Sequence, residues 1–166
     1  MATAPNLVSI DEYLETSYSP DREYIDGVIL ERNVGKGKHS FVQGKFVSHL
    51  SNRLGPKAVV LPEQRTRVSA ERVRIPDVCV VAELEEVTSK PPLLCIEVLS
   101  PDDRWNRVLE AVTDYQAMRV PCVWVVDPYS SRAWIFEADK PPIEVQDGKL
   151  VAPDLEVEIS LADVLP

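Results

Sequence analysis

IPDVCVV (residues 75–81) and LLCIEVL (residues 93–99) are two apolar, β-branched stretches, and each contains a single acid. Polar segments bound both stretches, a pattern that predicts two buried strands. An ionised carboxylate inside a buried strand is costly unless it is paired or binds a metal ion. Asp77 and Glu97 are therefore the first candidates for functional residues.

The alternation of side chains along a strand places Asp77 on the face of Cys79 and Glu97 on the face of Cys95. If the two strands are neighbours, the carboxylates meet on one face and repel each other unless a cation lies between them. Oxygen ligands of this kind select magnesium or manganese. The alternative is that each acid pairs with an arginine and only stabilises the fold; the candidates are Arg72, Arg74 and Arg104.

Upstream of these strands, three local patterns predict secondary structure. Ser9 followed by Glu12 is a capping box, which predicts a short helix from Ile10 that ends before Ser17. Asp26-Gly27 between two apolar triplets is typical of a tight hairpin. Apolar residues at helical spacing predict an amphipathic helix over residues 39–54.

The remaining elements complete an α/β pattern. We expect strands at residues 58–68, 72–82 and 93–99, a helix capped by Ser100 and extending to Met118, strands at 122–126 and 133–136, a hairpin at Asp147-Gly148 and a helical turn capped by Ser160. The core order is thus helix, three strands, helix, strand. It predicts one domain over residues 1–166, with a mixed sheet flanked by helices and an extra N-terminal hairpin.

The composition limits the function classes. No apolar run is long enough to cross a membrane, and no secretory signal is visible, so we expect a cytoplasmic protein. The odd number of cysteines, Cys79, Cys95 and Cys122, favours free thiols. The net charge of −9 disfavours DNA binding by the whole surface. Local contacts remain open, through Arg65, Arg67, Arg72 and Arg74 or through Lys36, Lys38 and Lys45, although either group also fits an ordinary solvated surface.

Four motifs together resemble a bacterial restriction endonuclease-like family of the PD-(D/E)xK nuclease superfamily. They are IPDV at residues 75–78, IEVLSP at 96–101, VP at 120–121 and WVVDP at 124–128, with EYIDG at 23–27 and His39 in addition. The resemblance extends from about Ile10 to the C-terminus and implies the same core order as above.

The resemblance also implies the site. Asp77 and Glu97 match the two acids of the superfamily motif, with Glu23 as a further metal ligand and His39 in the same cleft. Glu23 fits a surface acid better than a ligand, and a single histidine such as His39 is more often structural. The usual lysine is missing, because Leu99 and Ala111 occupy the two positions where similar proteins carry it. The arginines Arg104 and Arg107, on the following helix, are the candidates to replace its charge.

These observations predict a magnesium- or manganese-dependent endonuclease that hydrolyses DNA phosphodiester bonds and forms a homodimer. The alternative, favoured by the missing lysine, is a catalytically silent module that keeps the nuclease fold for binding or regulation.

Overall fold

The computed structural model describes residues 6–33 and 35–166. Its helices are α1 (Ile10–Glu15), α2 (Gly37–Leu54), α3 (Trp105–Ala117) and α4 (Leu161–Val164), with 3-10 turns at Gly55–Lys57 and Pro153–Leu155. Its strands are β1 (Glu23–Ile25), β2 (Val28–Leu30), β3 (Val59–Pro62), β4 (Thr66–Ser69), β5 (Arg72–Arg74), β6 (Val78–Val81), β7 (Leu94–Val98), β8 (Cys122–Asp127), β9 (Arg132–Glu137), β10 (Ile143–Glu144), β11 (Lys149–Ala152) and β12 (Val157–Ser160).

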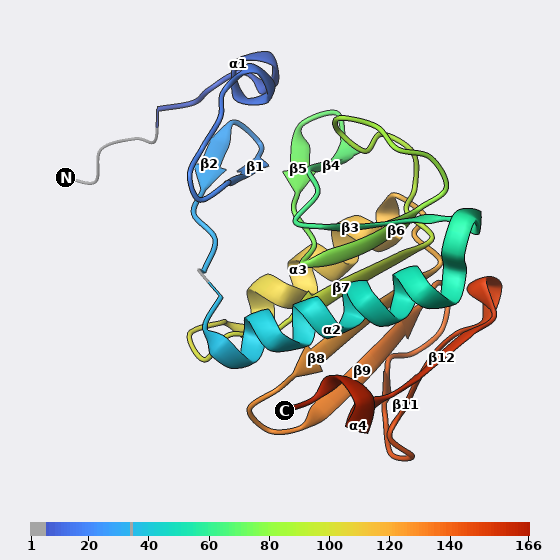
Figure 1. Cartoon of the computed structure of the whole chain (residues 1–166). Coiled ribbons are helices and arrows are strands. Elements are labelled where there is room, and N and C mark those ends of the chain that lie inside the picture. The colour runs from blue at the N-terminus through green and yellow to red at the C-terminus, as the bar shows by residue number, and fades with distance from the viewer. Residues whose placement is uncertain (1–5, 34) are drawn as a thin grey trace.

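The main sheet has six strands in the order β10-β9-β8-β7-β6-β3. Strands β7 and β8 are parallel and are joined through α3, while the other neighbours in this sheet are antiparallel. Helix α2 covers one face and α3 the other (Figure 1). On the α2 face, β11, β12 and α4 complete the core around the fully buried Trp124. The sequence-derived α/β fold with a mixed sheet is confirmed.

A second sheet of four strands, β2-β1-β5-β4, lies above the main sheet in Figure 1. It corrects the two long strands expected at residues 58–68 and 72–82, because each is two strands that belong to different sheets. Pro62 and Pro76 stand at the breaks, and proline cannot donate to a ladder. Glu63, with φ at 49°, turns the chain away from the main sheet.

Two further expectations are wrong. Helix α3 begins at Trp105 rather than at Ser100, because residues 100–103 form a separate turn. In that turn the Ser100 N–H donates to Asp103 Oδ2 at 2.6 Å. Asp147-Gly148 does not close a hairpin, since β10 pairs with β9 and β11 pairs with β12.

The N-terminal predictions are confirmed. Ser9 caps α1 by accepting the Glu12 N–H at 3.2 Å. Asp26 and Gly27 both have positive φ, as a two-residue hairpin between β1 and β2 requires. The three cysteines are free and buried, as expected. Among the described residues, no helix combines the length and the apolar character needed to span a membrane.

Candidate functional site

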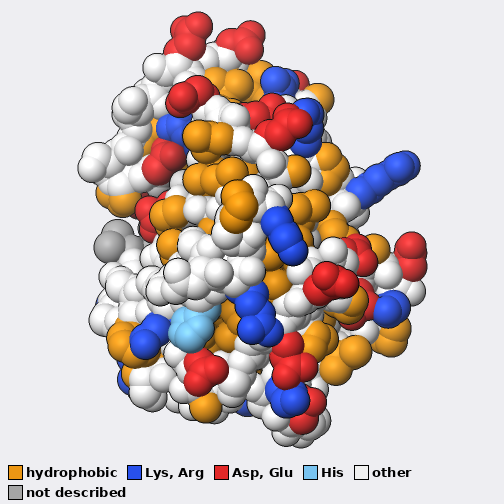
Figure 2. Space-filling view, turned by 45° about the vertical axis from the view of Figure 1, so that its right-hand side comes forward, with side chains coloured by type: hydrophobic (Ala, Val, Ile, Leu, Met, Phe, Trp, Pro, Cys, Tyr) orange, Lys and Arg blue, Asp and Glu red, His pale blue; other side chains and the backbone are white. Residues whose placement is uncertain are grey.

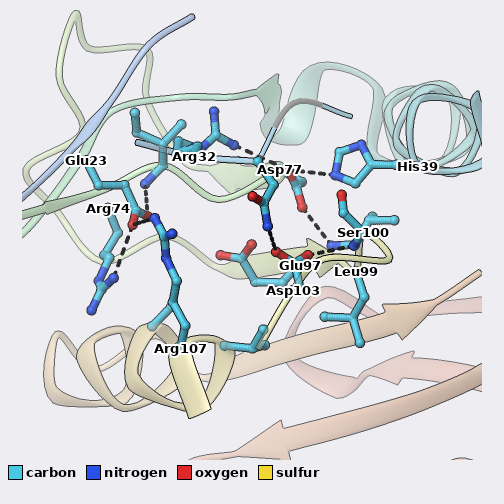
Figure 3. A pocket seen from close by; sticks show the side chains of 15 residues that line it. Glu23, Arg32, His39, Arg74, Asp77, Glu97, Leu99, Ser100, Asp103 and Arg107 are labelled. Carbon is cyan, nitrogen blue, oxygen red and sulfur yellow. Dashed lines mark hydrogen bonds and ion pairs between the residues drawn. The ribbon is translucent and has the colours of Figure 1, made fainter. Parts of the chain in front are cut away.

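A polar pocket opens where α2, α3 and both sheets meet, with a cavity volume of about 70 Å³. Its lining is unusual in charge, because four acids and four bases face one small space (Figure 3). The acids are Glu23, Asp77, Glu97 and Asp103, and the bases are Arg32, His39, Arg74 and Arg107. These side chains come from five places in the chain, so folding alone assembles the site.

Asp77 lies directly before β6 and is buried, and protein groups engage both of its carboxylate oxygens. Oδ1 accepts from Arg32 at 3.3 Å and lies 3.2 Å from Nε2 of His39. Oδ2 accepts the backbone N–H of Val98 at 2.7 Å. Asp77 is therefore held in place by a strand, a helix and the segment after β2.

Glu97 lies opposite Asp77, one step beyond the ladder pair of Val78 with Ile96. The register thus brings the two carboxylates together on one face, as the sequence predicts. The hydroxyl of Tyr115 on α3 donates to Glu97 Oε1 at 2.6 Å. Within the described residues, no hydrogen bond reaches Oε2, and Glu97 remains partly open to solvent through the pocket.

The surroundings of Glu97 shift the pKa of its carboxyl group. Burial raises its pKa well above the usual range for a glutamate, and the charge of Asp77 adds to the effect. The hydrogen bond from Tyr115 acts in the opposite direction but does not compensate. A cation held between the two carboxylates would relieve this repulsion.

Glu23 on β1 is buried and belongs to an ion-pair cluster rather than to the protein surface. Its Oε2 lies 3.1 Å from Arg74 and 3.6 Å from Arg107, and its Oε1 accepts the Ile75 N–H at 3.2 Å. Arg74, itself fully buried, also donates to Asp114 of α3 at 2.7 Å. Both oxygens of Glu23 are thus in use.

His39 lies in the first turn of α2 and is buried against Asp77. Burial acts to lower its pKa, but the hydrogen bond and the charge of Asp77 outweigh it, so the pKa lies above the usual value. Its Nδ1 has no hydrogen-bond partner among residues 6–33 and 35–166. A side chain at Gly35 would meet this nitrogen at 2.5 Å, which is why glycine suits that position.

The pocket brings together Asp77, Glu97, Glu23, His39 and Arg107. Leu99 and Ala111, the two positions without lysine, also line it. Arg104 does not line it. It is the exposed residue before α3, since the late start of that helix leaves it outside. Gln64, on the segment between β3 and β4, does not line it either and donates to the carbonyl of Glu85. Across residues 6–33 and 35–166, no three His, Cys, Asp or Glu side chains are close enough to hold one ion.

Sequence reasoning missed two members of the site, Arg32 and Tyr115. Burial acts to lower the pKa of Arg32, but the charges of Asp77, Glu97 and Glu63 raise it, so the guanidinium is a firmly held cation in the pocket. Tyr115 follows the apolar stripe of α3, and nothing in that stripe indicates its bond to Glu97.

A core of helix, three strands, helix and strand is formed by α2, β3, β6, β7, α3 and β8, with β4 and β5 inserted before β6. Together with two acids on paired strands, this core defines a restriction endonuclease-like, nuclease-type fold.

The chain belongs to the Uma2 family, whose model carries the description "Putative restriction endonuclease" and matches residues 10–164. A crystal structure from Anabaena variabilis, of "a putative nuclease belonging to DUF820", has the same fold with a TM-score of 0.85. The two chains are 22% identical, over 95% of this chain and 97% of that one. None of the curated proteins matches this chain.

Proposed function

We propose that the protein is a metal-dependent endonuclease and that the pocket hydrolyses phosphodiester bonds of DNA. The observation that carries the proposal is the meeting of Asp77 and Glu97 where β6 and β7 pair, with one oxygen of Glu97 that accepts no hydrogen bond from the described residues. Family membership and fold support it.

The donor set fits a divalent cation in part. Asp77 and Glu97 would hold magnesium or manganese, because these ions bind through one or two carboxylates and keep several waters. Glu23 fits less well as a direct ligand, since both of its oxygens are engaged by Arg74, Arg107 and the Ile75 N–H. A bound ion would supply an activated water and stabilise the charge that develops on a phosphate.

The chain's own cations would bind and orient the phosphate. The Arg107 side chain is partly exposed and, among the described residues, donates to one carbonyl, that of Glu31, besides its contact with Glu23. Arg32 lines the same pocket and contacts Asp77 at 3.3 Å, so its guanidinium would lie beside a phosphate bound there. Arginine binds phosphate oxygens well but cannot act as a general base. Neither residue therefore restores every role of the missing lysine.

The runner-up is a catalytically silent nuclease-fold module, which two observations favour. The pairing of Asp77 with Arg32 and His39 already neutralises one ligand without metal. Leu99 and Ala111 leave the pocket without lysine. Such a module would bind its partner equally well with or without the Glu97 charge.

Plasmid nicking in magnesium and in manganese separates the two functions. Glu97→Gln keeps the shape of the side chain and should abolish nicking and weaken manganese binding in calorimetry. Glu110→Gln, an exposed acid on α3, is the matched control and should change neither. Absence of metal-dependent nicking by the wild type, together with unchanged manganese binding in Glu97→Gln, would contradict the enzyme.

A homodimer and a cytoplasmic location complete the proposal. Both rest on the sequence resemblance and composition. Sedimentation equilibrium of the full chain measures the first, and a monomer at all concentrations would contradict it. Fractionation of the source cells measures the second.

A further inference from the structure

The charge of the chain is distributed unevenly. The protein has a net charge of −9 and 27 acidic residues, yet residues 32–62 contain no aspartate or glutamate. The same segment carries six cationic residues, namely Arg32, Lys36, Lys38, Lys45, Arg53 and Lys57. It consists mainly of α2, so an acidic protein contains one helix that is purely basic. Acids and bases are interspersed on the face in Figure 2, and any basic surface is therefore local.

The outward side of α2 carries Lys38, Phe41 and Lys45, at helical spacings of three and four. The opposite side, with Val42, Phe46, Leu50 and Leu54, is buried on the main sheet. Phe41 is 43% exposed although it is one of only three phenylalanines in the chain. Phe41 is thus a large ring that is partly exposed on the same side of α2 as two lysines.

The two lysines of this surface lack acidic partners within the described part of the chain and lie over aromatic rings instead. Lys38 Nζ is 5.5 Å from the ring centroid of Tyr129, which is 41% exposed, and Lys45 Nζ is 5.4 Å from that of Phe41. Lys90 and Lys149, by contrast, form ion pairs. One acid, Asp163, is on α4, which packs against α2.

The other basic group considered from the sequence is not available in the same way. Arg65 is paired with Asp21, Arg72 with Asp26 and Asp114, and Arg74 with Glu23 and Asp114. Arg67 donates to the carbonyl of Ala70. Cations that are already paired with acids gain little free energy from binding phosphates. Of the two basic groups, the lysines of α2 are therefore the better candidates for contacts with DNA.

This surface begins at the pocket. His39, which follows Lys38, lines the pocket. Leu99 also lines it, and its N–H donates to the carbonyl of Val126, three residues before Tyr129. The Tyr129 ring lies against Lys38, the residue before His39, so this surface adjoins the segment that lines the pocket, and Phe41 follows one turn along α2.

We propose that Lys38, Phe41, Lys45 and Tyr129, the α2 outer surface, bind single-stranded DNA and lead the strand to the pocket. The inference rests on the proposed function and names its substrate form. The lysines supply positive charge to phosphates, and the rings offer stacking faces to bases. Unpaired bases expose such faces, whereas bases in a duplex stack on each other. The surface therefore fits a single strand.

Fluorescence anisotropy with a labelled oligonucleotide, single-stranded or duplex, in EDTA tests the inference in the full chain without cleavage. The double variant Lys38→Gln, Lys45→Gln should lower single-strand affinity about tenfold and reduce the salt slope by about 0.7 per lysine. The control Lys90→Gln, Lys149→Gln removes the same charge from paired lysines and should bind like the wild type. Phe41→Ala should also lower affinity about tenfold, while Leu84→Ala, another exposed apolar residue, should not.

Three results would overturn the inference: no single-strand binding by the wild type, tighter binding of the duplex than of the single strand, or equal affinities for the α2 variant and its control. Its failure is distinguishable from that of the proposed function. Nicking that depends on Glu97, with α2 variants that bind like the wild type, removes this inference alone. Single-strand binding that depends on α2, without cleavage in any metal, removes the enzyme alone.

Discussion

Asp77→Asn and Glu97→Gln, the two amide substitutions in the pocket, should change stability in opposite directions in metal-free buffer. Each keeps the shape of its side chain and removes one charge. Asp77 is paired with Arg32 and His39, so its loss leaves buried cations without their carboxylate. Glu97 faces Asp77, so its loss removes a like charge.

The loss of stability expected for Asp77→Asn follows from the contacts of the Asp77 carboxylate. The amide can keep one acceptor, for either the Val98 N–H at 2.7 Å or the Arg32 and His39 pair, but not both. Hydrogen bonds to charged groups contribute about 1.5–3 kcal/mol each, and a broken buried ion pair costs about 3–5 kcal/mol. Because Arg32 contacts Asp77 at a long 3.3 Å, we expect about 3 kcal/mol. In a chain of 166 residues that is a loss of about 6–12 °C in Tm.

For Glu97→Gln we expect a stability equal to or above that of the wild type, because Gln still accepts the Tyr115 hydroxyl. Urea denaturation at pH 7.5 with EDTA measures both variants. Destabilisation of both by similar amounts would refute the reasoning, since Glu97 would then be a structural acid. If Asp77→Asn stabilised the protein, the ion pair between Arg32 and Asp77 would not contribute to stability.

The contribution of Glu97 to folding stability should change with pH in one direction. The folded state raises the pKa of Glu97 above its unfolded value of about 4.3, so the folded protein binds the proton more tightly. The contribution of this group to stability is therefore favourable at low pH and is lost as pH rises above that value. The advantage of Glu97→Gln over the wild type should grow with pH and vanish in acid; a gain that is constant with pH would contradict the assignment.

Further predictions concern other parts of the molecule. Ala111→Lys places a lysine in the pocket wall. It should raise metal-dependent nicking about tenfold, because one charge in a preorganised site is worth a few kcal/mol. Unchanged nicking would contradict the idea that this lysine reaches the phosphate. Arg74→Gln should lower unfolding free energy by about 3 kcal/mol in urea, because Glu23 and Asp114 lose a buried partner. Burial raises the pKa of Cys79 to about 12, so a thiol reagent should modify Cys79 only in denaturant, as intact-protein mass would show.

The meeting of Asp77 and Glu97 could be predicted from sequence because it needs only alternation and neighbouring strands. The split of each long strand between two sheets could not, since a proline marks a break but not the direction that the chain takes afterwards. The turn at Ser100 shows a similar limit. One hydrogen bond expected of a helix cap does form, because Asp103 accepts the Ser100 N–H. Asp103 also accepts a hydrogen bond from Asn33, and Asp102 accepts one from Lys36. These long-range contacts hold the turn apart from α3.

Arg32 shows the same limit of sequence-based prediction, here for the site. Its contact with Asp77 spans 45 residues of sequence, and no local pattern specifies such a pair. Tyr115 continues the apolar stripe of α3, and its ring is buried in the core. Its hydroxyl meets Glu97 only because α3 crosses back over β7, which is a consequence of the parallel connection to β8.

The attachment of the four-stranded sheet to α3 has an evolutionary consequence. Arg72 and Arg74 on β5 share Asp114, and Arg74 also binds Glu23 from the neighbouring strand. An apolar contact tolerates changes of size and direction, but a guanidinium that binds two carboxylates does not. Loss of one member leaves its partners charged and buried. Across relatives of this chain, these four positions should therefore co-vary as a group, exchanged together or kept together, while the apolar residues around them drift independently.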